Sequence, residues 1–331
     1  MKFRRAAAEC ERKMDRQALL RQEESSSPVR NNNDSGYNLG RIVGDWRYQA
    51  GLYSLLSEHH GLPGTAYTNL RGVALVAPWV MYLGAADIAL SLLLPVKLFA
   101  PDLVYRVSSW IAYSVWRWVQ GIFEVGNGAQ IHFHGDVLPQ KESAIIVSNH
   151  VSWTDFYMIQ ALAQRSGMLG QCRWFAKIQL RAVPFLGWGL WAMGLISFSE
   201  ATRFTAQKYE ESKIWCKQNG RPQPLHLLYP RTKGFIKTVQ HLRKAPHVKA
   251  VYDFTIAYQH RNRFLAAPDM WQTLKLPNLT SVHGYQFHVM ARRYPLDELP
   301  HTDEELAKWL EERWVEKGEW LESRRLEWAS K

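Results

Sequence analysis

The segment from Ile145 to Asp155 constrains the fold of this chain more than any other stretch. Its apolar, β-branched start is typical of a buried strand. The polar residues Ser148, Asn149 and His150 follow at once, where a strand would pass into a turn. Asp155 then precedes an apolar segment, as an acidic residue in the first turn of a helix does. The segment therefore predicts a strand, a turn and a helix.

The pair of His150 and Asp155 is the first candidate for chemistry. Strand ends are where α/β folds usually place their functional groups. A histidine held by a carboxylate is a common general base. The spacing of four intervening residues is short and common, so a hydrogen-bonded surface pair is an alternative interpretation.

Alternating short elements continue through the rest of the chain. Further strands are expected at residues 130–135, 172–176, 225–228 and 250–258, and an apolar segment at 188–198. Helices are expected at residues 155–163, 178–182, 204–217 and 235–243. Thr302 and Glu305 form a capping-box pattern that opens a C-terminal packing helix. The pattern predicts an α/β domain, a mixed sheet flanked by helices, over residues 126–320.

Two apolar runs precede this domain. The run of ~27 residues from Val73 to Phe99 exceeds the ~20 needed to span a bilayer, although Asp87 is costly there. The run from Leu103 to Phe123 carries arginines and tryptophans, as an interfacial helix does. We predict a membrane anchor of one or two helices at residues 71–124, after a flexible polar region at 1–70. The alternative is two buried helices of a soluble domain.

The charge balance points to anionic partners. The net charge is +11, and the chain has 15 tryptophans and 14 tyrosines. The sequence has no zinc-finger or RNA-binding signature, so we expect membrane lipids and not nucleic acid as partners. Three widely spaced cysteines indicate reduced thiols, so the folded domain is expected to face the cytosol.

Four motifs in order carry a resemblance to a known family. His150 and Asp155 are followed by Lys177, Pro184 and Gly187, then by Glu200-Ala-Thr-Arg203, and then by Pro230-Arg-Thr-Lys-Gly-Phe235. Over residues 128–320 this order resembles the glycerolipid acyltransferases of the PlsC type, which share a His-x4-Asp motif. The last motif is most similar to the eukaryotic branch of lysocardiolipin, lysophosphatidylinositol and lysophosphatidic acid acyltransferases.

The resemblance implies an enzyme that transfers an acyl chain from acyl-CoA to a lysophospholipid in phospholipid synthesis or remodelling, without a bound cofactor or metal. It implies a membrane location, which we expect to be the endoplasmic reticulum. It also implies that His150 is the base and that Asp155 orients it. The expected substrate-binding residues are Asn149, Lys177, Pro184, Gly187, Glu200, Thr202, Arg203, Pro230, Arg231 and Lys233.

Two departures from the family pattern stand out. Ala201 replaces the glycine of the Glu-Gly-Thr-Arg motif, where a left-handed backbone would be strained. Near residues 194–199 the chain also lacks an arginine-bearing strand and the helix that follows it in the family. An alternative is therefore a catalytically inactive splice form or gene-model variant that only binds membranes or lipids.

The sequence offers two other kinds of chemistry as alternatives. A covalent serine hydrolase is disfavoured because the chain has no GxSxG motif, so Ser148 and Ser152 are expected to be structural. His132 and His134 share one face of a predicted strand, a spacing that zinc uses. With His150 they define a third, distant hypothesis, a metal-dependent hydrolase.

Overall fold

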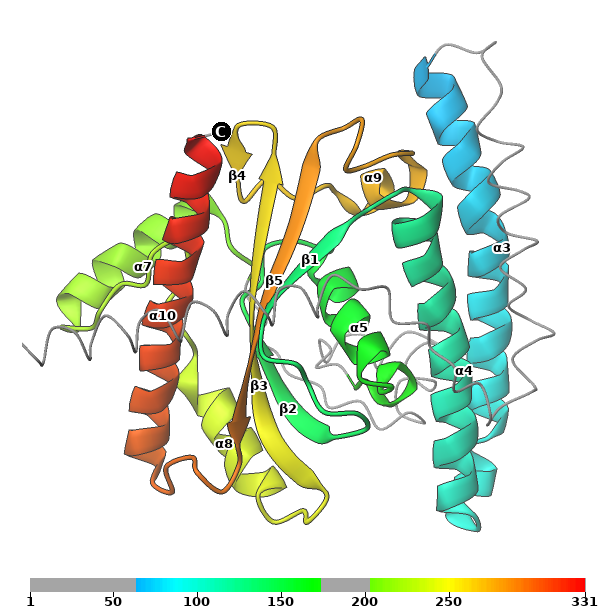
Figure 1. The fold of residues 1–331 in the computed structure, drawn as a ribbon. Coiled ribbons are helices and arrows are strands. Elements are labelled where there is room, and N and C mark those ends of the chain that lie inside the picture. Colours follow the sequence, from blue (N-terminus) through cyan, green and yellow to red (C-terminus); the bar gives the residue numbers. More distant parts are fainter. Residues whose placement is uncertain (1–63, 174–202, 331) are drawn as a thin grey trace, which may run out of the picture. The chain divides into compact units, whose positions relative to one another are not determined.

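A computed structural model of the chain describes residues 64–173 and 203–330 (Figure 1). The contacts divide the chain into Met1–Val43 and Gly44–Lys331, and every described residue lies in the second unit. Most of the polar region expected at residues 1–70, namely 1–63, and the motifs at 174–202 therefore fall outside the described residues. Residues 64–70 were expected to be flexible but form the start of a helix.

A mixed five-stranded sheet forms the centre of this unit. Its strands are β1 (Ile131–Gly135), β2 (Ser143–Ser148), β3 (Val248–His260), β4 (Arg263–Phe264) and β5 (Tyr285–Pro295). The order is β1-β5-β3-β2, and β4 pairs with β3. β1 runs parallel to β5 and β2 runs parallel to β3, whereas β3 and β5 are antiparallel. The mixed sheet flanked by helices agrees with the sequence prediction.

Strand β3 is buried on both faces and separates the hydrophobic clusters that lie on its two sides. Its even-numbered residues from Ala250 to Tyr258 belong to one hydrophobic cluster. Val251 belongs to a second cluster and Ala257 to a third, on the other face. Because side chains alternate along a strand, this pattern requires helices on both faces of the sheet.

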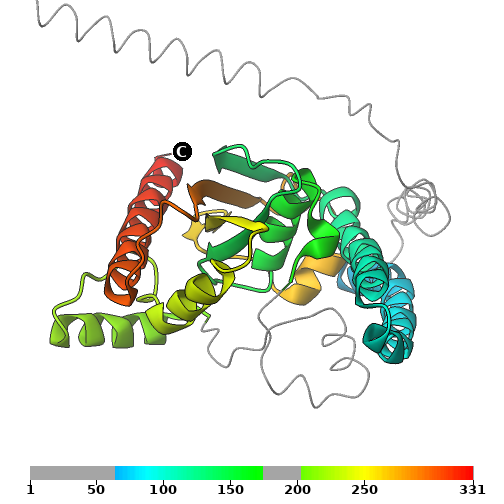
Figure 2. The ribbon, with the colours of Figure 1, turned by 90° about the horizontal axis from the view of Figure 1, so that it is seen from below.

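Helices cover both faces. On the even-residue face lie α5 (Asp155–Arg165) and α9 (Met270–Lys275), near the 3-10 turn η3 (Leu169–Gln171). On the other face lie α8 (Thr232–Leu242) and α10 (Asp303–Ala329), with α7 (Ala206–Gln218) beyond them (Figures 1 and 2). Thr302 caps α10 by accepting a hydrogen bond from the Glu305 amide, as its capping pattern predicts.

The two apolar runs form neighbouring helices, α3 (Gly64–Leu92) and α4 (Pro101–Gly121). The 3-10 turn η1 (Pro95–Leu98) lies between them, and a π-helical turn, η2 (Ile122–Gly126), follows α4. The indole N–H of Trp79 donates to the Val115 carbonyl at 3.1 Å, and this bond joins the two helices. Within residues 64–173 and 203–330, one helical segment, Gly64–Leu98, is long and apolar enough to cross a membrane.

Arg71 fastens the first turns of α3 to the domain. Its guanidinium is buried and donates to Oδ1 of Asn127 at 2.6 Å and to the Gly126 carbonyl at 2.6 Å. A third bond reaches the Lys275 carbonyl in α9 at 3.0 Å. The start of α3 is therefore part of the folded domain.

Two sequence predictions differ from the structure. Residues 225–228 form a turn and not a strand, because His226 adopts a left-handed backbone with φ of 61° and breaks the extended chain. Sequence reasoning also missed β5, although Tyr285, Phe287, Val289 and Ala291 alternate with more polar positions, as a strand does. β5 completes the sheet by pairing with both β1 and β3.

Candidate active site

The loop between β2 and α5 brings His150 and Asp155 together. Nδ1 of His150 lies 2.7 Å from Oδ2 of Asp155. The same carboxylate oxygen accepts the backbone N–H groups of Val151 at 2.6 Å and Ser152 at 3.1 Å. The four-residue spacing thus lets the loop curl over a carboxylate in the first turn of α5, at the positive end of the helix dipole.

This geometry fixes the tautomer of the imidazole. A carboxylate only accepts hydrogen bonds, so Nδ1 of His150 carries the proton that points at Asp155. In the neutral ring, Nε2 on the opposite side then holds a lone pair that can accept a proton. The His150 side chain is 37% exposed whereas that of Asp155 is 5% exposed, so the ring meets solvent and its partner does not.

Tyr258 completes the shell around the carboxylate. Its hydroxyl donates to Oδ1 of Asp155 at 2.7 Å from the middle of the sheet. Complete burial, and then the charge of Asp155, hold the pKa of Tyr258 well above its ordinary value, so the hydroxyl stays protonated and remains a donor. Sequence reasoning missed this residue. In the sequence, the one indication of its role was that Tyr258 ends the strand expected at residues 250–258, which comes later in the chain than the strand before His150.

The structure places the side chain of Asn149 against the backbone of β3. Its side-chain amide donates to the Ile256 carbonyl at 2.9 Å, and its carbonyl accepts the Ile256 N–H at 2.8 Å. The residue is 5% exposed. Both hydrogen bonds continue the pairing of β2 with β3 beyond the last strand residue, so the side chain holds the loop to the sheet.

Nearby hydroxyls also bond to the backbone. Ser148 donates to the Asn149 carbonyl at 3.0 Å, and Ser152 donates to the Pro268 carbonyl at 3.3 Å. Buried Thr154 reaches the same Pro268 carbonyl at 2.9 Å. These contacts are those expected of structural serines.

Only part of the expected substrate-binding set lies near His150 in the described structure. The Phe204 N–H donates to the His150 carbonyl at 2.9 Å, which places exposed Arg203 beside the loop. Lys177, Pro184, Gly187, Glu200 and Thr202 fall outside the described residues.

The last motif lies at the start of α8. Pro230 is buried, whereas Arg231 and Lys233 are exposed. α8 packs against Ile145 of the edge strand β2, on the face opposite α5. The motif thus begins a helix that packs beside β2, and His150 lies just past the C-terminal end of the same strand.

The described structure does not bring together the three histidines of the metal-hydrolase alternative. His132 and His134 lie on β1, which the order of the sheet separates from β2 by two strands. Nε2 of His134 instead lies 2.9 Å from Nδ1 of His288. Among the described residues, no group of three histidine, cysteine or acidic side chains is arranged to hold a metal ion.

Comparisons with known proteins agree on one family. Residues 130–259 match the family model described as Acyltransferase, and residues 279–323 match the model described as Acyltransferase C-terminus. The first match contains His150, Asp155 and Tyr258.

Named relatives align over part of their length. The chain is 27% identical to 1-acyl-sn-glycerol-3-phosphate acyltransferase 3 of Arabidopsis thaliana, over 69% of this chain and 66% of that protein. It is 31% identical to the human 1-acyl-sn-glycerol-3-phosphate acyltransferase delta, over 55% of this chain and 53% of that protein. The chain thus spans between about half and two thirds of the length of these relatives.

A solved structure was also matched. It is the crystal structure of the 1-acyl-sn-glycerophosphate (LPA) acyltransferase PlsC from Thermotoga maritima. The match has a TM-score of 0.37 and 14% identity, and it covers 72% of this chain and 95% of that one.

Proposed function

Because the chain belongs to the acyltransferase family, we propose that it transfers a fatty acyl chain from acyl-CoA to the free hydroxyl of a lysophospholipid. Lysophosphatidic acid is the first acceptor to consider, since the relatives are named for acylating 1-acyl-sn-glycerol 3-phosphate. The observation that carries the proposal is the hydrogen bond between His150 and Asp155 inside the matched domain.

In the proposed reaction, Nε2 of His150 takes the proton of the acceptor hydroxyl as its oxygen attacks the thioester carbonyl. The new carbon–oxygen bond forms, the carbon–sulfur bond breaks, and the imidazolium returns its proton to the departing CoA sulfur. Asp155 holds Nδ1 and stabilises the transient positive charge on the ring. The reaction needs no metal and forms no intermediate on a serine.

Basic side chains suit the phosphates of both substrates. We assign Arg203, with Glu200 and Thr202, to the acceptor phosphate, because a planar guanidinium binds phosphate oxygens in pairs and Arg203 adjoins the His150 loop. Lys177, Pro184 and Gly187 are assigned to the approach of the acceptor. Pro230, Arg231 and Lys233 are assigned to phosphates of acyl-CoA or lipid.

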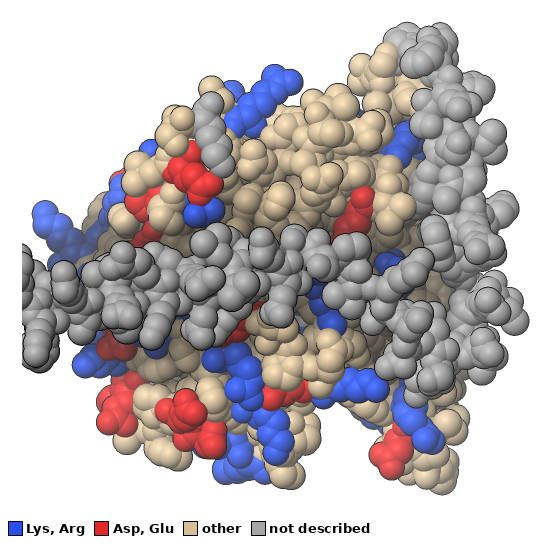
Figure 3. Space-filling model, in the orientation of Figure 1, with Lys and Arg blue, Asp and Glu red and all other residues tan. Residues whose placement is uncertain are grey.

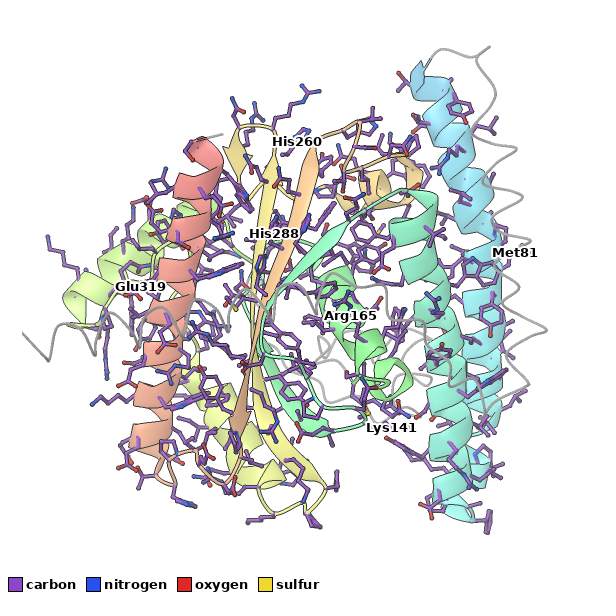
Figure 4. The ribbon with its side chains drawn as sticks, viewed as in Figure 1. Met81, Lys141, Arg165, His260, His288 and Glu319 are labelled. Carbon is purple, nitrogen blue, oxygen red and sulfur yellow. The ribbon has the colours of Figure 1, made fainter. Side chains whose placement is uncertain are left out.

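The helices α3 and α4 suit a membrane surface. Several large apolar side chains of α3, α4 and the turn between them are exposed, among them Met81 at 76%, Leu98 at 81% and Phe99 at 88%. Met81 points away from the sheet domain (Figure 4). Arg71 ties the start of α3 to Gly126, just after α4, so these two ends lie together against the sheet domain. We place the domain on the cytosolic face of the endoplasmic reticulum.

A second candidate is an inactive member of the family that only binds membranes or lipids. The sequence between Gly194 and Glu200 favours it, because the arginine-bearing strand and helix of the family are missing there.

The test is acyl transfer by membranes that carry this chain, with acyl-CoA and a panel of lysophospholipids. His150→Ala is expected to lower kcat by roughly 10²- to 10⁴-fold, while Ser148→Ala, which removes a hydroxyl bonded to the backbone, stays near the unmodified rate. Unchanged turnover in His150→Ala would show that His150 is not the general base. Activity only after the family segment is restored would support the inactive form, and no transfer by either chain would overturn the enzyme assignment.

A further inference from the structure

A long part of the chain carries basic residues without acidic ones. Residues 212–252 contain six lysines and three arginines, and no aspartate or glutamate. Some of these cations serve the fold: Arg221 pairs with Glu311 at 3.2 Å, and Arg243 donates to the carbonyls of Leu299 and Pro300 at 3.0 and 2.9 Å. Two of the remaining lysines form a row on α8 together with a histidine.

The row consists of Lys237, His241 and Lys244, and we call it the α8 basic stripe. All three residues are exposed. The helical turn continues past Leu242, since the Lys244 N–H donates to the His241 carbonyl at 3.4 Å. Steps of four and three residues place the side chains on one face, one per turn.

The opposite face of α8 packs into the hydrophobic core. Phe235 and Val239 are buried in a cluster with Leu306 and Leu310 of α10, and Phe235 stacks on Trp309 with ring centroids 5.6 Å apart. This packing fixes the rotation of α8 about its axis. The α8 basic stripe is therefore held outward by the core and is not free to turn inward.

The stripe and the apolar turn between α3 and α4 occupy the same end of the unit. In Figure 1 the C-terminal end of α8 and the α3–α4 turn both lie at the lower end. Figure 3 shows both basic and acidic atoms on the visible face at that end. Exposed Lys141, in the turn before β2, also lies in the lower part of the view (Figure 4).

We propose that the α8 basic stripe contacts anionic lipid headgroups of the same leaflet that receives the exposed apolar side chains of α3, η1 and α4. A single small anion needs donors that converge on one point. Here the basic side chains stand in a line on a convex helix, one for each turn of about 5.4 Å, which matches a plane of many phosphates. The proposal rests on the membrane association proposed above, but not on acyl transfer.

The experiment is vesicle binding by the full chain. Wild-type protein is compared on phosphatidylcholine vesicles and on vesicles with about 30% phosphatidylserine, at low salt and at about 0.5 M NaCl. The variant is Lys237→Gln with Lys244→Gln, which leaves Arg231 and Lys233 in place. The matched control is Lys208→Gln with Lys217→Gln on α7, which removes the same charge from exposed lysines elsewhere.

Wild-type protein is expected to prefer anionic vesicles at low salt and to lose this preference at high salt. At about 1 kcal/mol per lysine near the surface, the α8 variant should bind anionic vesicles roughly 30-fold more weakly, with little change on neutral ones. The α7 control should keep the wild-type preference. A thermal melt of each variant checks that it is folded.

Other results separate the proposals. Equal wild-type binding to both vesicles, or an α8 variant that keeps the anionic preference, overturns the role of the stripe and leaves membrane association standing. Failure to bind either vesicle overturns membrane association itself. Weaker CoA binding by the α8 variant with unchanged vesicle binding assigns the stripe to the acyl donor and also overturns the lipid proposal.

Discussion

The Tyr258 hydroxyl donates a 2.7 Å hydrogen bond to Oδ1 of Asp155, while Oδ2 of the same carboxylate holds Nδ1 of His150. The two residues are 103 positions apart in the chain, and β3 brings them together. A donor on Oδ1 withdraws negative charge from the carboxylate and so weakens its hold on an imidazolium. From inside the core, Tyr258 is thus placed to adjust how strongly Asp155 holds His150, the proposed base.

Tyr258→Phe should therefore change the pH dependence of turnover. Without the hydroxyl, Asp155 holds the imidazolium of His150 more strongly, so the acid limb of the kcat/KM profile is expected to move to higher pH. The variant should also lose about 1–3 kcal/mol of stability because Oδ1 becomes an unsatisfied buried acceptor. Tyr252→Phe is the control, since Tyr252 lies on the same strand and donates to Glu142 at 2.6 Å. Identical pH profiles for wild type and Tyr258→Phe would contradict the tuning role.

Asn149→Ala should act on stability first. It leaves the N–H and carbonyl of Ile256 unpaired in a buried position, which is expected to cost about 2–4 kcal/mol of unfolding free energy. The measurement is the Tm of the purified protein, together with KM for the acceptor. A raised KM with an unchanged Tm would instead support the substrate-binding role that the sequence predicts.

Arg71→Lys should loosen the start of α3. A lysine cannot reproduce the forked contacts with Asn127, Gly126 and Lys275, so a loss of about 2–4 kcal/mol and faster hydrogen exchange at the start of α3 are expected. Arg117→Lys is the control, because Arg117 is exposed on α4 and makes one long hydrogen bond of 3.4 Å to Gln164. Equal exchange in both variants would show that the Arg71 contacts do not hold the helix.

The histidine cluster predicts loss of stability in acid. Burial, and then the charges of His132 and His134, lower the pKa of His288 to about 3. The unfolded chain takes up this proton near pH 6.5, so the native state is favoured above that pH and loses stability as the pH falls from about 6.5 toward 3. Thermal melts between pH 7 and about 4.5 measure this slope. His288→Gln, which does not titrate, should flatten it, and an unchanged slope would assign the acid sensitivity to other groups.

Much of the fold follows from local sequence pattern. The β-branched run before Asn149 formed β2, the apolar segment after Asp155 formed α5, and Thr302 with Glu305 opened α10. The two apolar runs formed α3 and α4. Side-chain periodicity and end-capping groups are short-range properties, so they can be read from neighbouring residues.

Residues 225–228 show where local pattern is insufficient. Their apolar composition favours a strand, but Leu227 is buried against Leu321 of α10 and His226 bonds Glu322 at 2.6 Å. These contacts with a distant helix hold a left-handed turn that propensity does not indicate. Tertiary contacts override a weak local preference in such a short segment.

The sequence by itself determined that His150 and Asp155 would meet, because a strand end, a four-residue turn and the first turn of a helix leave the two side chains side by side. It also determined a mixed sheet with helices on both faces, through the alternation of its elements. Only the tertiary structure decided that Tyr258 donates the last hydrogen bond to Asp155 and that the Asn149 side chain bonds the backbone of Ile256. It also decided that the ring of His134 lies against that of His288 and away from His150. Each of these contacts joins residues more than 100 positions apart, and the strand order that brings them together is set by packing of the whole sheet.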